Sequence, residues 1–231
     1  MATYGFGPAV EQWGGFLSDL VCVPHADHML VQFPDGIAPA VLASASDNLS
    51  DAWRAVGPPL AQEPRAEVLV VGGASSGSIG LYAAALAVAL GADSVLYVDA
   101  DEARTRIAAE LGAQTLAEPP KRLGPFPITV DSSAEAAGLK LALRSTAPDG
   151  TCTSTAIYFG EQPELPLLEM YTKGITFRTG RVHAREAMPD VIALAASGAV
   201  RPELVTTRTV AWDDAPDALR ECDWTKLVVE R

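Results

Sequence analysis

A glycine-rich turn between two apolar segments contains the residues most able to do chemistry. The stretch 68–80 reads VLVVGGASSGSIG, so that a run of aliphatic residues leads into a turn and then into an alanine-rich segment. Glycines let a backbone approach phosphate groups closely, and the free N–H groups at a helix N-terminus point toward them. The stretch supplies the last two glycines of the dinucleotide-binding pattern G-x-G-x-x-G. The residues predicted to contact a dinucleotide are Gly73, Ser75, Gly77, Ser78, Ile79 and Gly80.

An acidic residue follows this turn at the spacing that dinucleotide binding requires. Asp99 lies nineteen positions after Gly80 and ends the next apolar run, residues 94–99. A carboxylate at this position accepts hydrogen bonds from the ribose hydroxyls of NAD and repels the 2′-phosphate of NADP. The combination of strand, glycine turn, helix, strand and acid therefore predicts an NAD(H) site. The structural alternative is a tight strand–helix unit in which Asp99 caps a helix.

A second acidic residue, Asp131, follows a later apolar run that begins at Ile128. Ligands bind beyond the carboxyl ends of the strands in open parallel sheets. Asp131 is therefore a further candidate for cofactor contact, with a plain turn role as the alternative.

The same turn also fits the signature of a serine nucleophile. Residues 73–77 match G-x-S-x-G, in which Ser75 would attack the substrate of a serine hydrolase. Such an enzyme needs an acid and then a histidine later in the chain, and His183 is the histidine that follows Ser75. The stretch is also close to the TGASSGIG motif of short-chain dehydrogenases, but it begins after residue 70 and no Tyr-x-x-x-Lys pair is present.

The elements that must position these residues alternate regularly from residue 67 onward. Continuous apolar strands that alternate with helices predict a parallel sheet covered on both faces, with right-handed crossovers. We therefore expect an α/β fold with a doubly wound sheet of the Rossmann type. The strands are predicted at residues 68–71, 94–99, 128–133, 151–160 and 174–180.

The two ends of the chain have a different pattern. Residues 14–24 and 28–36 are short apolar runs closed by proline or glycine, which predicts strands. A helix over 39–56 and a proline-rich connector over 57–65 are expected to follow. The tail, residues 203–231, is expected to return to a strand, a short helix and a strand.

The composition limits the classes of partner. The chain has 231 residues, of which 48% are hydrophobic, enough for one large domain or one domain with part of another. Its net charge of −12 repels nucleic-acid phosphates and anionic lipids, so neither is expected as a partner. Cys22, Cys152 and Cys222 form no C-x-x-C pair and no signal peptide is present, which favours a reducing, cytoplasmic location.

Taken together, these segments resemble the medium-chain dehydrogenase/reductase family, the zinc-type alcohol dehydrogenases. The resemblance is carried by residues 14–36, 41–57, 68–113, 170–207 and 213–231. It implies a remnant of a GroES-like catalytic domain over residues 1–45, an NAD-binding Rossmann domain over 46–204, and a return to the catalytic-domain remnant over 205–231. The two chain ends would then form a truncated β-rich layer.

The resemblance also implies a reaction: hydride transfer between nicotinamide and a small alcohol or carbonyl substrate, helped by a catalytic zinc. It places Arg104 against the adenosine part of NAD(H), and it aligns Asp47 with the last zinc ligand of the family. The Cys and Gly-His-Glu ligands of the family have no counterpart in this sequence. One carboxylate cannot hold a catalytic zinc, which takes three protein ligands, so zinc is not expected to be held by this chain alone.

Two expectations follow from the missing ligands and strands. A non-catalytic NAD-binding module, or a truncated product, is the alternative to an active oxidoreductase. Exposed edges of the truncated layer favour a homo-oligomer or other association through those edges.

Overall fold

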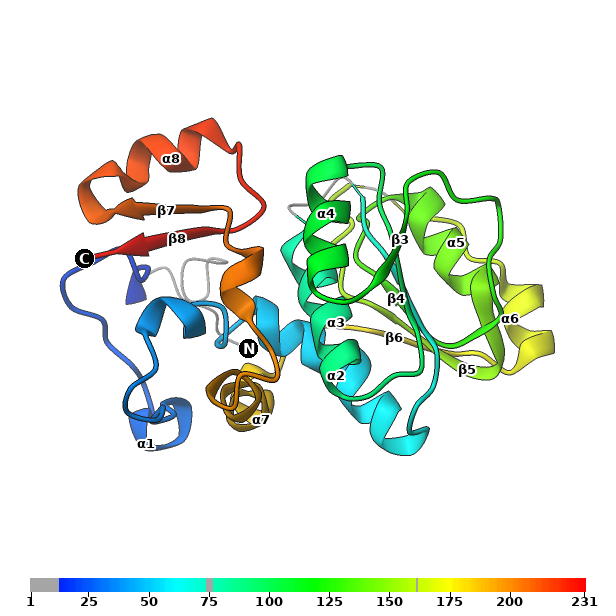
Figure 1. Cartoon of the computed structure of the whole chain (residues 1–231), viewed down its shortest axis with the longest axis horizontal. Coiled ribbons are helices and arrows are strands. Elements are labelled where there is room, and N and C mark those ends of the chain that lie inside the picture. Colours follow the sequence, from blue (N-terminus) through cyan, green and yellow to red (C-terminus); the bar gives the residue numbers. More distant parts are fainter. Residues whose placement is uncertain (1–12, 74–76, 161) are drawn as a thin grey trace. The chain divides into compact units, whose positions relative to one another are not determined.

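Six parallel strands form the sheet that carries the candidate site, as seen in the computed structural model, which describes residues 13–73, 77–160 and 162–231. The strand order is β3-β2-β1-β4-β5-β6, and every neighbouring pair is parallel (Figure 1). The strands are β1 (Val68–Val71), β2 (Val95–Val98), β3 (Gln114–Leu116), β4 (Phe126–Asp131), β5 (Thr146–Ser154) and β6 (Thr176–Thr179). The order reverses direction between β1 and β4, and such a switch point opens a crevice at the carboxyl edge of a sheet.

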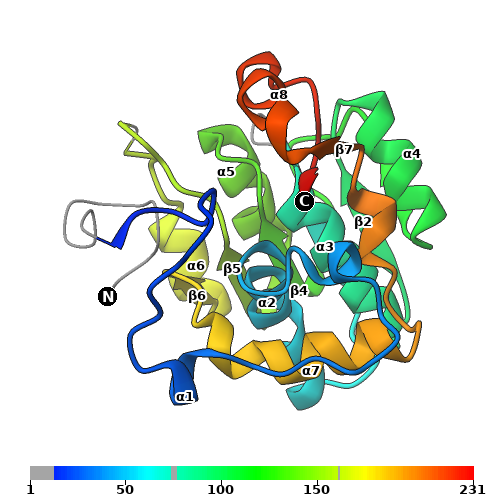
Figure 2. The ribbon, with the colours of Figure 1, turned by 90° about the vertical axis from the view of Figure 1, so that its left-hand side faces the viewer.

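Helices cover both faces of this sheet. Figure 1 shows α2 and α3 on one face and α5 and α6 on the other, and Figure 2 shows α7 lying alongside α2. The helices are α2 (Asn48–Gln62), α3 (Ser78–Ala89), α4 (Glu102–Glu110), α5 (Ala136–Ser145), α6 (Leu167–Lys173) and α7 (Ala184–Ala196). The predicted α/β fold with a doubly wound parallel sheet is confirmed.

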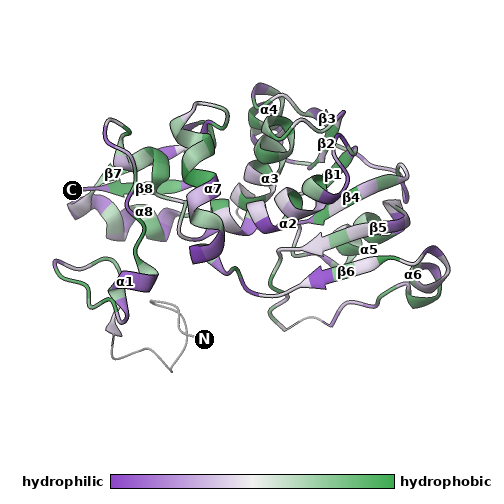
Figure 3. Ribbon diagram, turned by 90° about the horizontal axis from the view of Figure 1, so that it is seen from below, coloured by the Kyte–Doolittle hydropathy of each residue, from purple (hydrophilic) through white to green (hydrophobic). Residues whose placement is uncertain are grey.

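The central strand β1 has only apolar residues because helices cover both of its faces. All four residues of β1 are buried, and β1 is hydrophobic along its length (Figure 3). Leu69 and Val71 pack with Leu139 and Leu143 of α5 on one face. On the other face the fully buried alanines of α3 let this helix pack closely against α2, because a methyl group leaves room for the neighbouring backbone.

The prediction of a proline-rich connector over residues 57–65 is wrong. Helix α2 continues through Pro58 and Pro59 and ends at Gln62. Pro59 and Leu60 are buried, so the packing of this turn offsets the hydrogen bonds that the prolines cannot donate. The predicted helix over 39–56 is also divided, into a 3₁₀ turn at Pro39–Leu42 and the later start of α2.

The chain divides into two compact units, Met1–Gln32 and Phe33–Arg231. In the first unit, residues 13–32 form one short helix, α1 (Ala26–Met29), and bends, so the strand predicted over 14–24 does not form and the run from residue 28 begins in a helix. Periodicity alone was a weak signal there, because short apolar runs without a paired strand can take other conformations. The predicted domain boundaries near residues 45 and 204 stay predictions.

The tail of the chain folds as predicted. Strands β7 (Arg208–Ala211) and β8 (Leu227–Glu230) pair in parallel, and α8 (Ala215–Glu221) lies between them in sequence. No helix among residues 13–73, 77–160 and 162–231 has the length and apolar character needed to cross a membrane.

The start of α3 depends on a glycine. Gly77 is the N-cap of this helix with φ 81°, in the left-handed region that favours glycine. A Cβ on Gly77 would collide with Cδ of Arg104 and come within 2.9 Å of its Nε. The side chain of Arg104, which arises from α4, therefore lies directly on the glycine turn.

This contact predicts a difference between two glycine variants. Gly91 has nearly the same φ, 83°, but a Cβ there would meet nothing within 4 Å. Both Gly77→Ala and Gly91→Ala should lose about 1 kcal/mol of unfolding free energy for a Cβ at positive φ. Gly77→Ala should lose a further ~1–3 kcal/mol, because it displaces Arg104. Urea unfolding measures both losses, and equal losses would contradict the contact.

The N-cap of α4 predicts a pH-dependent contribution to stability. Asp101 Oδ1 accepts a hydrogen bond from the backbone N–H of Arg104 at 2.9 Å, and this bond lowers the pKa of the Asp101 carboxyl. Asp101→Ala should cost about 1 kcal/mol of unfolding free energy at pH 7. A lowered folded-state pKa gives stability that is present above the unfolded pKa, about 3.9, and is lost as the pH falls through the folded pKa. The difference in unfolding free energy between wild type and Asp101→Ala should therefore decrease toward zero as the pH falls below about 4.

Glu110→Ala, at the last residue of α4, is the matched control for this measurement. An acidic side chain at a helix C-terminus opposes the helix dipole, so its removal should leave stability unchanged or slightly higher at pH 7. If the difference in unfolding free energy between wild type and Asp101→Ala were the same at every pH, the Asp101 carboxylate would not be the cap of α4.

Candidate functional site

The carboxylate at the end of β2 is held by four hydrogen bonds. Asp99 Oδ2 accepts from Arg104 Nε at 2.7 Å and from the Tyr97 hydroxyl at 2.8 Å. Its Oδ1 accepts from Arg104 Nη2 at 2.8 Å and from the backbone N–H of Asp101 at 2.9 Å. The Asp99 side chain is 1% exposed. The two bonds from one guanidinium form a bidentate pair, the strongest arrangement available to a carboxylate.

Arg104 connects this carboxylate to the glycine turn. Its Nη2 also donates to the carbonyl oxygen of Gly73 at 2.9 Å, and its stem lies against Gly77. The hydrogen bonds to Asp99 raise the pKa of Arg104, and burial together with the Asp99 charge raises the pKa of Tyr97. Both groups therefore stay protonated donors. The structure brings together four of the predicted residues: Gly73, Gly77, Asp99 and Arg104.

A cleft of about 840 Å³ opens beside this cluster. The ends of β1 and β2 line it, with Gly72, Gly73 and Asp99. The segment after β3 and helix α5 also line it and contribute the basic residues Lys121 and Lys140. Cationic groups and bare backbone next to a carboxylate suit a ligand that carries both phosphate and hydroxyl groups.

The predicted residues at the start of α3 lie in its first turn. Ser78 is buried, and its hydroxyl accepts a hydrogen bond from Asn48 Nδ2 at 2.8 Å. A Cβ on Gly80 would lie 3.3 Å from Cβ of Ser132, so glycine permits close packing of α3 on the end of β4. Ile79 is half-buried, and Ser75 lies outside the described residues.

Asp131 lies on the other side of the switch point and is fully buried. Its Oδ1 accepts from the Ser133 hydroxyl at 2.6 Å and from the Ser133 backbone N–H at 3.1 Å. Its Oδ2 accepts from the hydroxyls of Ser154 and Tyr158, each at 2.7 Å. Burial, together with the Asp131 charge, raises the pKa of Tyr158, which remains a donor. Asp131 therefore joins the ends of β4 and β5 and does not open onto the cleft, so its predicted cofactor contact stays a prediction.

The residue predicted as a metal ligand, Asp47, belongs to no group of metal-ligating side chains among the described residues. Asp47 is the N-cap of α2, and partial burial raises its pKa against the opposing charge of Lys226. Within residues 13–73, 77–160 and 162–231, no group of three His, Cys, Asp or Glu side chains could hold a metal ion. The described side chains therefore do not fit a catalytic zinc, which takes three protein ligands.

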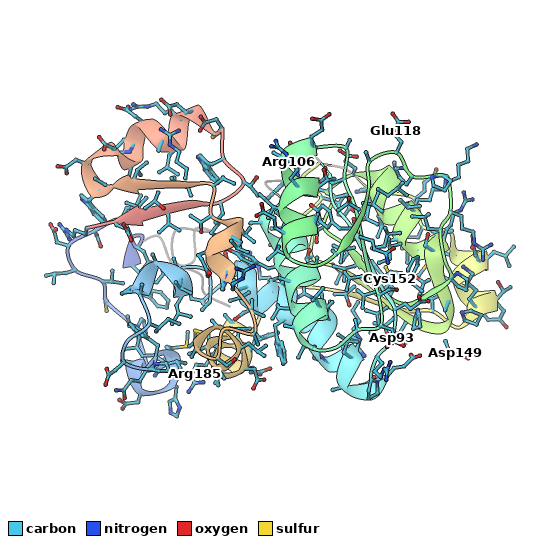
Figure 4. The ribbon with its side chains drawn as sticks, viewed as in Figure 1. Asp93, Arg106, Glu118, Asp149, Cys152 and Arg185 are labelled. Carbon is cyan, nitrogen blue, oxygen red and sulfur yellow. The ribbon has the colours of Figure 1, made fainter. Side chains whose placement is uncertain are left out.

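Two other chemically notable residues lie apart from the cleft. His183 is the N-cap residue of α7 and is exposed. Cys152 lies in the interior of the sheet (Figure 4), and burial raises the pKa of its thiol to about 12. A thiol with that pKa is not a nucleophile at neutral pH.

Sequence reasoning missed the partners of both carboxylates. Tyr97 is two positions before Asp99, and alternation along a strand puts them on one face, so this pair had a readable signal. The contacts of Asp131 with Ser154 and Tyr158 join segments more than twenty positions apart and have no local signal.

Comparison with known proteins identifies the family. A family model described as "Zinc-binding dehydrogenase" matches residues 78–197. A probable zinc-binding alcohol dehydrogenase of Mycobacterium tuberculosis is 27% identical over 215 residues, which cover 87% of this chain and 53% of that protein. The chain spans little more than half the length of the curated relatives it matches.

Solved structures agree with this match. The alcohol dehydrogenase TADH from Thermus sp. ATN1 superimposes with a TM-score of 0.81 at 27% identity, covering 98% of this chain and 70% of that one. A short chain alcohol dehydrogenase from Escherichia coli, complexed with NADH, has a TM-score of 0.67 at 20% identity, covering 82% of this chain and 57% of that one, a likeness of fold. The chain therefore belongs to the zinc-binding dehydrogenase family, among the medium-chain, zinc-type alcohol dehydrogenases.

Proposed function

We propose that this chain binds NAD(H) at the carboxyl edge of its sheet and serves hydride transfer between nicotinamide and an alcohol or carbonyl substrate. The observation that carries the proposal is the position of Asp99 beside the glycine turn, on the wall of the cleft. The Escherichia coli relative that shares this fold was solved with NADH, which supports a nicotinamide cofactor. When bound, the nicotinamide ring accepts or donates the hydride.

The residues of this chain would hold the cofactor through two features. The backbone N–H groups of Ser78, Ile79 and Gly80 precede the first bonded N–H of α3, that of Leu81, and free N–H groups at a helix N-terminus suit a diphosphate. The Asp99 carboxylate would accept hydrogen bonds from a ribose diol. Arg104 holds both oxygens of that carboxylate, so its guanidinium has to share or vacate them as the diol binds.

The preference for NAD over NADP follows from the same carboxylate. A 2′-phosphate beside Asp99 would place two anions together, and the positive charge of Arg104 offsets only part of that repulsion. Neither the substrate nor an association through exposed edges is tested by the described contacts, and both stay predictions.

A non-catalytic NAD-binding module is the second candidate. It is favoured by the finding that the described residues assemble no three metal-ligating side chains. The serine hydrolase has no comparable support: Ser75 lies outside the described residues, and the family match is to dehydrogenases.

The cofactor assignment predicts the effect of one substitution. Asp99→Ala should weaken NADH binding by at least about tenfold, because it removes a charged acceptor for the ribose diol. Titration calorimetry or energy transfer from tryptophan to NADH measures the dissociation constant. Wild-type affinity in Asp99→Ala would remove Asp99 from the site.

The matched control is Asp93→Ala. Asp93 also pairs with an arginine Nε at 2.7 Å, that of Arg65, but it precedes β2. Figure 4 shows Asp93 well apart from Glu118, which follows β3. Asp93 lies at the amino ends of the parallel strands, and Glu118 lies at their carboxyl ends. NADH affinity should be unchanged in Asp93→Ala. A loss equal to that of Asp99→Ala would show that removing an ion pair is sufficient, and would remove the specific role of Asp99.

The metal finding predicts indifference to chelation. Treatment with EDTA should leave both the melting temperature and the NADH affinity unchanged, because the described residues provide no three-ligand site. Elemental analysis after dialysis against zinc should find well below one equivalent. One tightly held equivalent, lost together with thermal stability on chelation, would contradict this and favour the catalytic candidate over the module.

A further inference from the structure

A second polar cluster lies at the carboxyl edge of the sheet, on the opposite side of the switch point from Asp99. A dinucleotide bound at a switch point extends across it, with one nucleotide on each half of the sheet. The cleft beside Asp99 is lined by the ends of β1 and β2, by residues after β3 and by Glu135 and α5, but by no residue of β4, β5 or β6. The ends of β4, β5 and β6 are therefore left for the second nucleotide.

Arg54 of α2 reaches the ends of two of these strands. Its Nη2 donates to the carbonyl oxygen of Gly180, just beyond β6, at 2.8 Å and to that of Ser154, the last residue of β5, at 3.4 Å. These strands are neighbours, with Ser154 in register with Thr179. One cation thus bridges the last carbonyl group of β5 and the first carbonyl group beyond β6.

Asp51 holds this guanidinium in place. Its Oδ1 forms an ion pair with Arg54 Nε, one helical turn away on α2. The side chains of Asp51 and Arg54 are 10% and 21% exposed. Burial raises the pKa of Asp51, and the charge of Arg54 opposes that shift. A partly buried pair of this kind loses less rotamer freedom and less strength to solvent than an exposed pair.

Ser154 links this pair to the buried carboxylate of Asp131. While its carbonyl oxygen accepts from Arg54, its hydroxyl donates to Asp131 Oδ2. The same oxygen of Asp131 accepts from the Tyr158 hydroxyl, which lies after β5. The network therefore runs from α2 through the ends of β6, β5 and β4.

We propose that Arg54 is a positioning residue for the nicotinamide half of the cofactor, which rests on the proposed function above. By tying the carbonyl ends of β5 and β6 to α2, Arg54 keeps the backbone beyond both strands in one arrangement. A preorganised wall of backbone acceptors binds a nucleoside more tightly than a wall that must first order itself. The adenosine half depends instead on Asp99 and the glycine turn.

The test compares two probes, NADH and ADP, because ADP lacks the whole nicotinamide nucleoside. In Arg54→Met the dissociation constant for NADH should rise about tenfold, while that for ADP stays within about twofold. Arg54→Lys keeps a cation for Asp51 but has one nitrogen, which cannot take the separate places of Nε on Asp51 and of Nη2 on the two carbonyl groups, so it should show the same selective loss with less effect on folding. Circular dichroism and the melting temperature establish that each variant is folded.

Arg220→Met is the matched control, since Asp217 and Arg220 form an ion pair at the same three-residue spacing but on the exposed helix α8. It should leave both dissociation constants unchanged. An unchanged ratio of the two constants in the folded Arg54 variants, whether both probes bind normally or both weaken equally, would overturn the positioning role. If wild-type protein bound ADP and NADH with the same dissociation constant, the proposed site for the nicotinamide half would be overturned, but the site for the adenosine half would not. Wild-type protein that binds neither would overturn the proposed function as well.

Discussion

The bidentate pair of Asp99 and Arg104 joins the end of β2 and the first turn of α4, five residues apart, and Arg104 connects both to the turn after β1, some thirty residues earlier. Arg104 can reach the Gly73 carbonyl because Gly77 lacks a side chain where that of Arg104 crosses the turn. The requirement is mutual. A Cβ at Gly77 displaces the guanidinium, and loss of the guanidinium leaves a buried carboxylate with fewer donors, which is costly. Glycine, arginine and aspartate at these positions therefore act as one unit.

The sheet carries a carboxylate on each side of its switch point, and the two have different environments. Asp99 is neutralised by a cation on a long side chain at the wall of an open cleft. Asp131 is surrounded by hydroxyl and backbone donors of Ser154, at the end of β5, and of Ser133 and Tyr158, in the segments after β4 and β5. Asp99 lines the cleft, where ligand hydroxyls can replace donors of Arg104, whereas Asp131 is fully buried and is not among the residues that line the cleft. The first arrangement suits contact with a ligand, and the second suits holding the neighbouring loops in register.

Much of the sheet could be predicted from sequence because its central strands are continuous aliphatic runs that alternate with longer segments ended by glycine, such as those that stop at Gly91 and Gly112. The short strand at Gln114–Leu116 and helix α6 were not predicted, since they have only three and seven residues, too few to establish a period. The continuation of α2 through Pro58 and Pro59 depends on tertiary packing, which overrides the local signal of proline. The strands predicted over residues 14–24 and 28–36 do not form, because an apolar run predicts a strand only where another strand is available to pair with it.

The same division holds for the candidate site. Spacing was sufficient to place Asp99 near the glycine turn, because a strand, a turn and a helix have fixed lengths. It could not predict that Arg104 would occupy the carboxylate, or that Arg54 would bridge β5 and β6. Those contacts depend on the path of long side chains between elements, which no local pattern encodes.

The burial of Cys152 divides the thiols of this chain into two classes. Cys22 and Cys222 are exposed, whereas Cys152 is fully enclosed in the sheet with its thiol protonated at neutral pH. A maleimide reagent therefore reaches two sulfur atoms in the native protein and the third only when the sheet opens. The slow modification of that third sulfur reports the opening of the nucleotide-binding fold from a position that no ligand needs to touch.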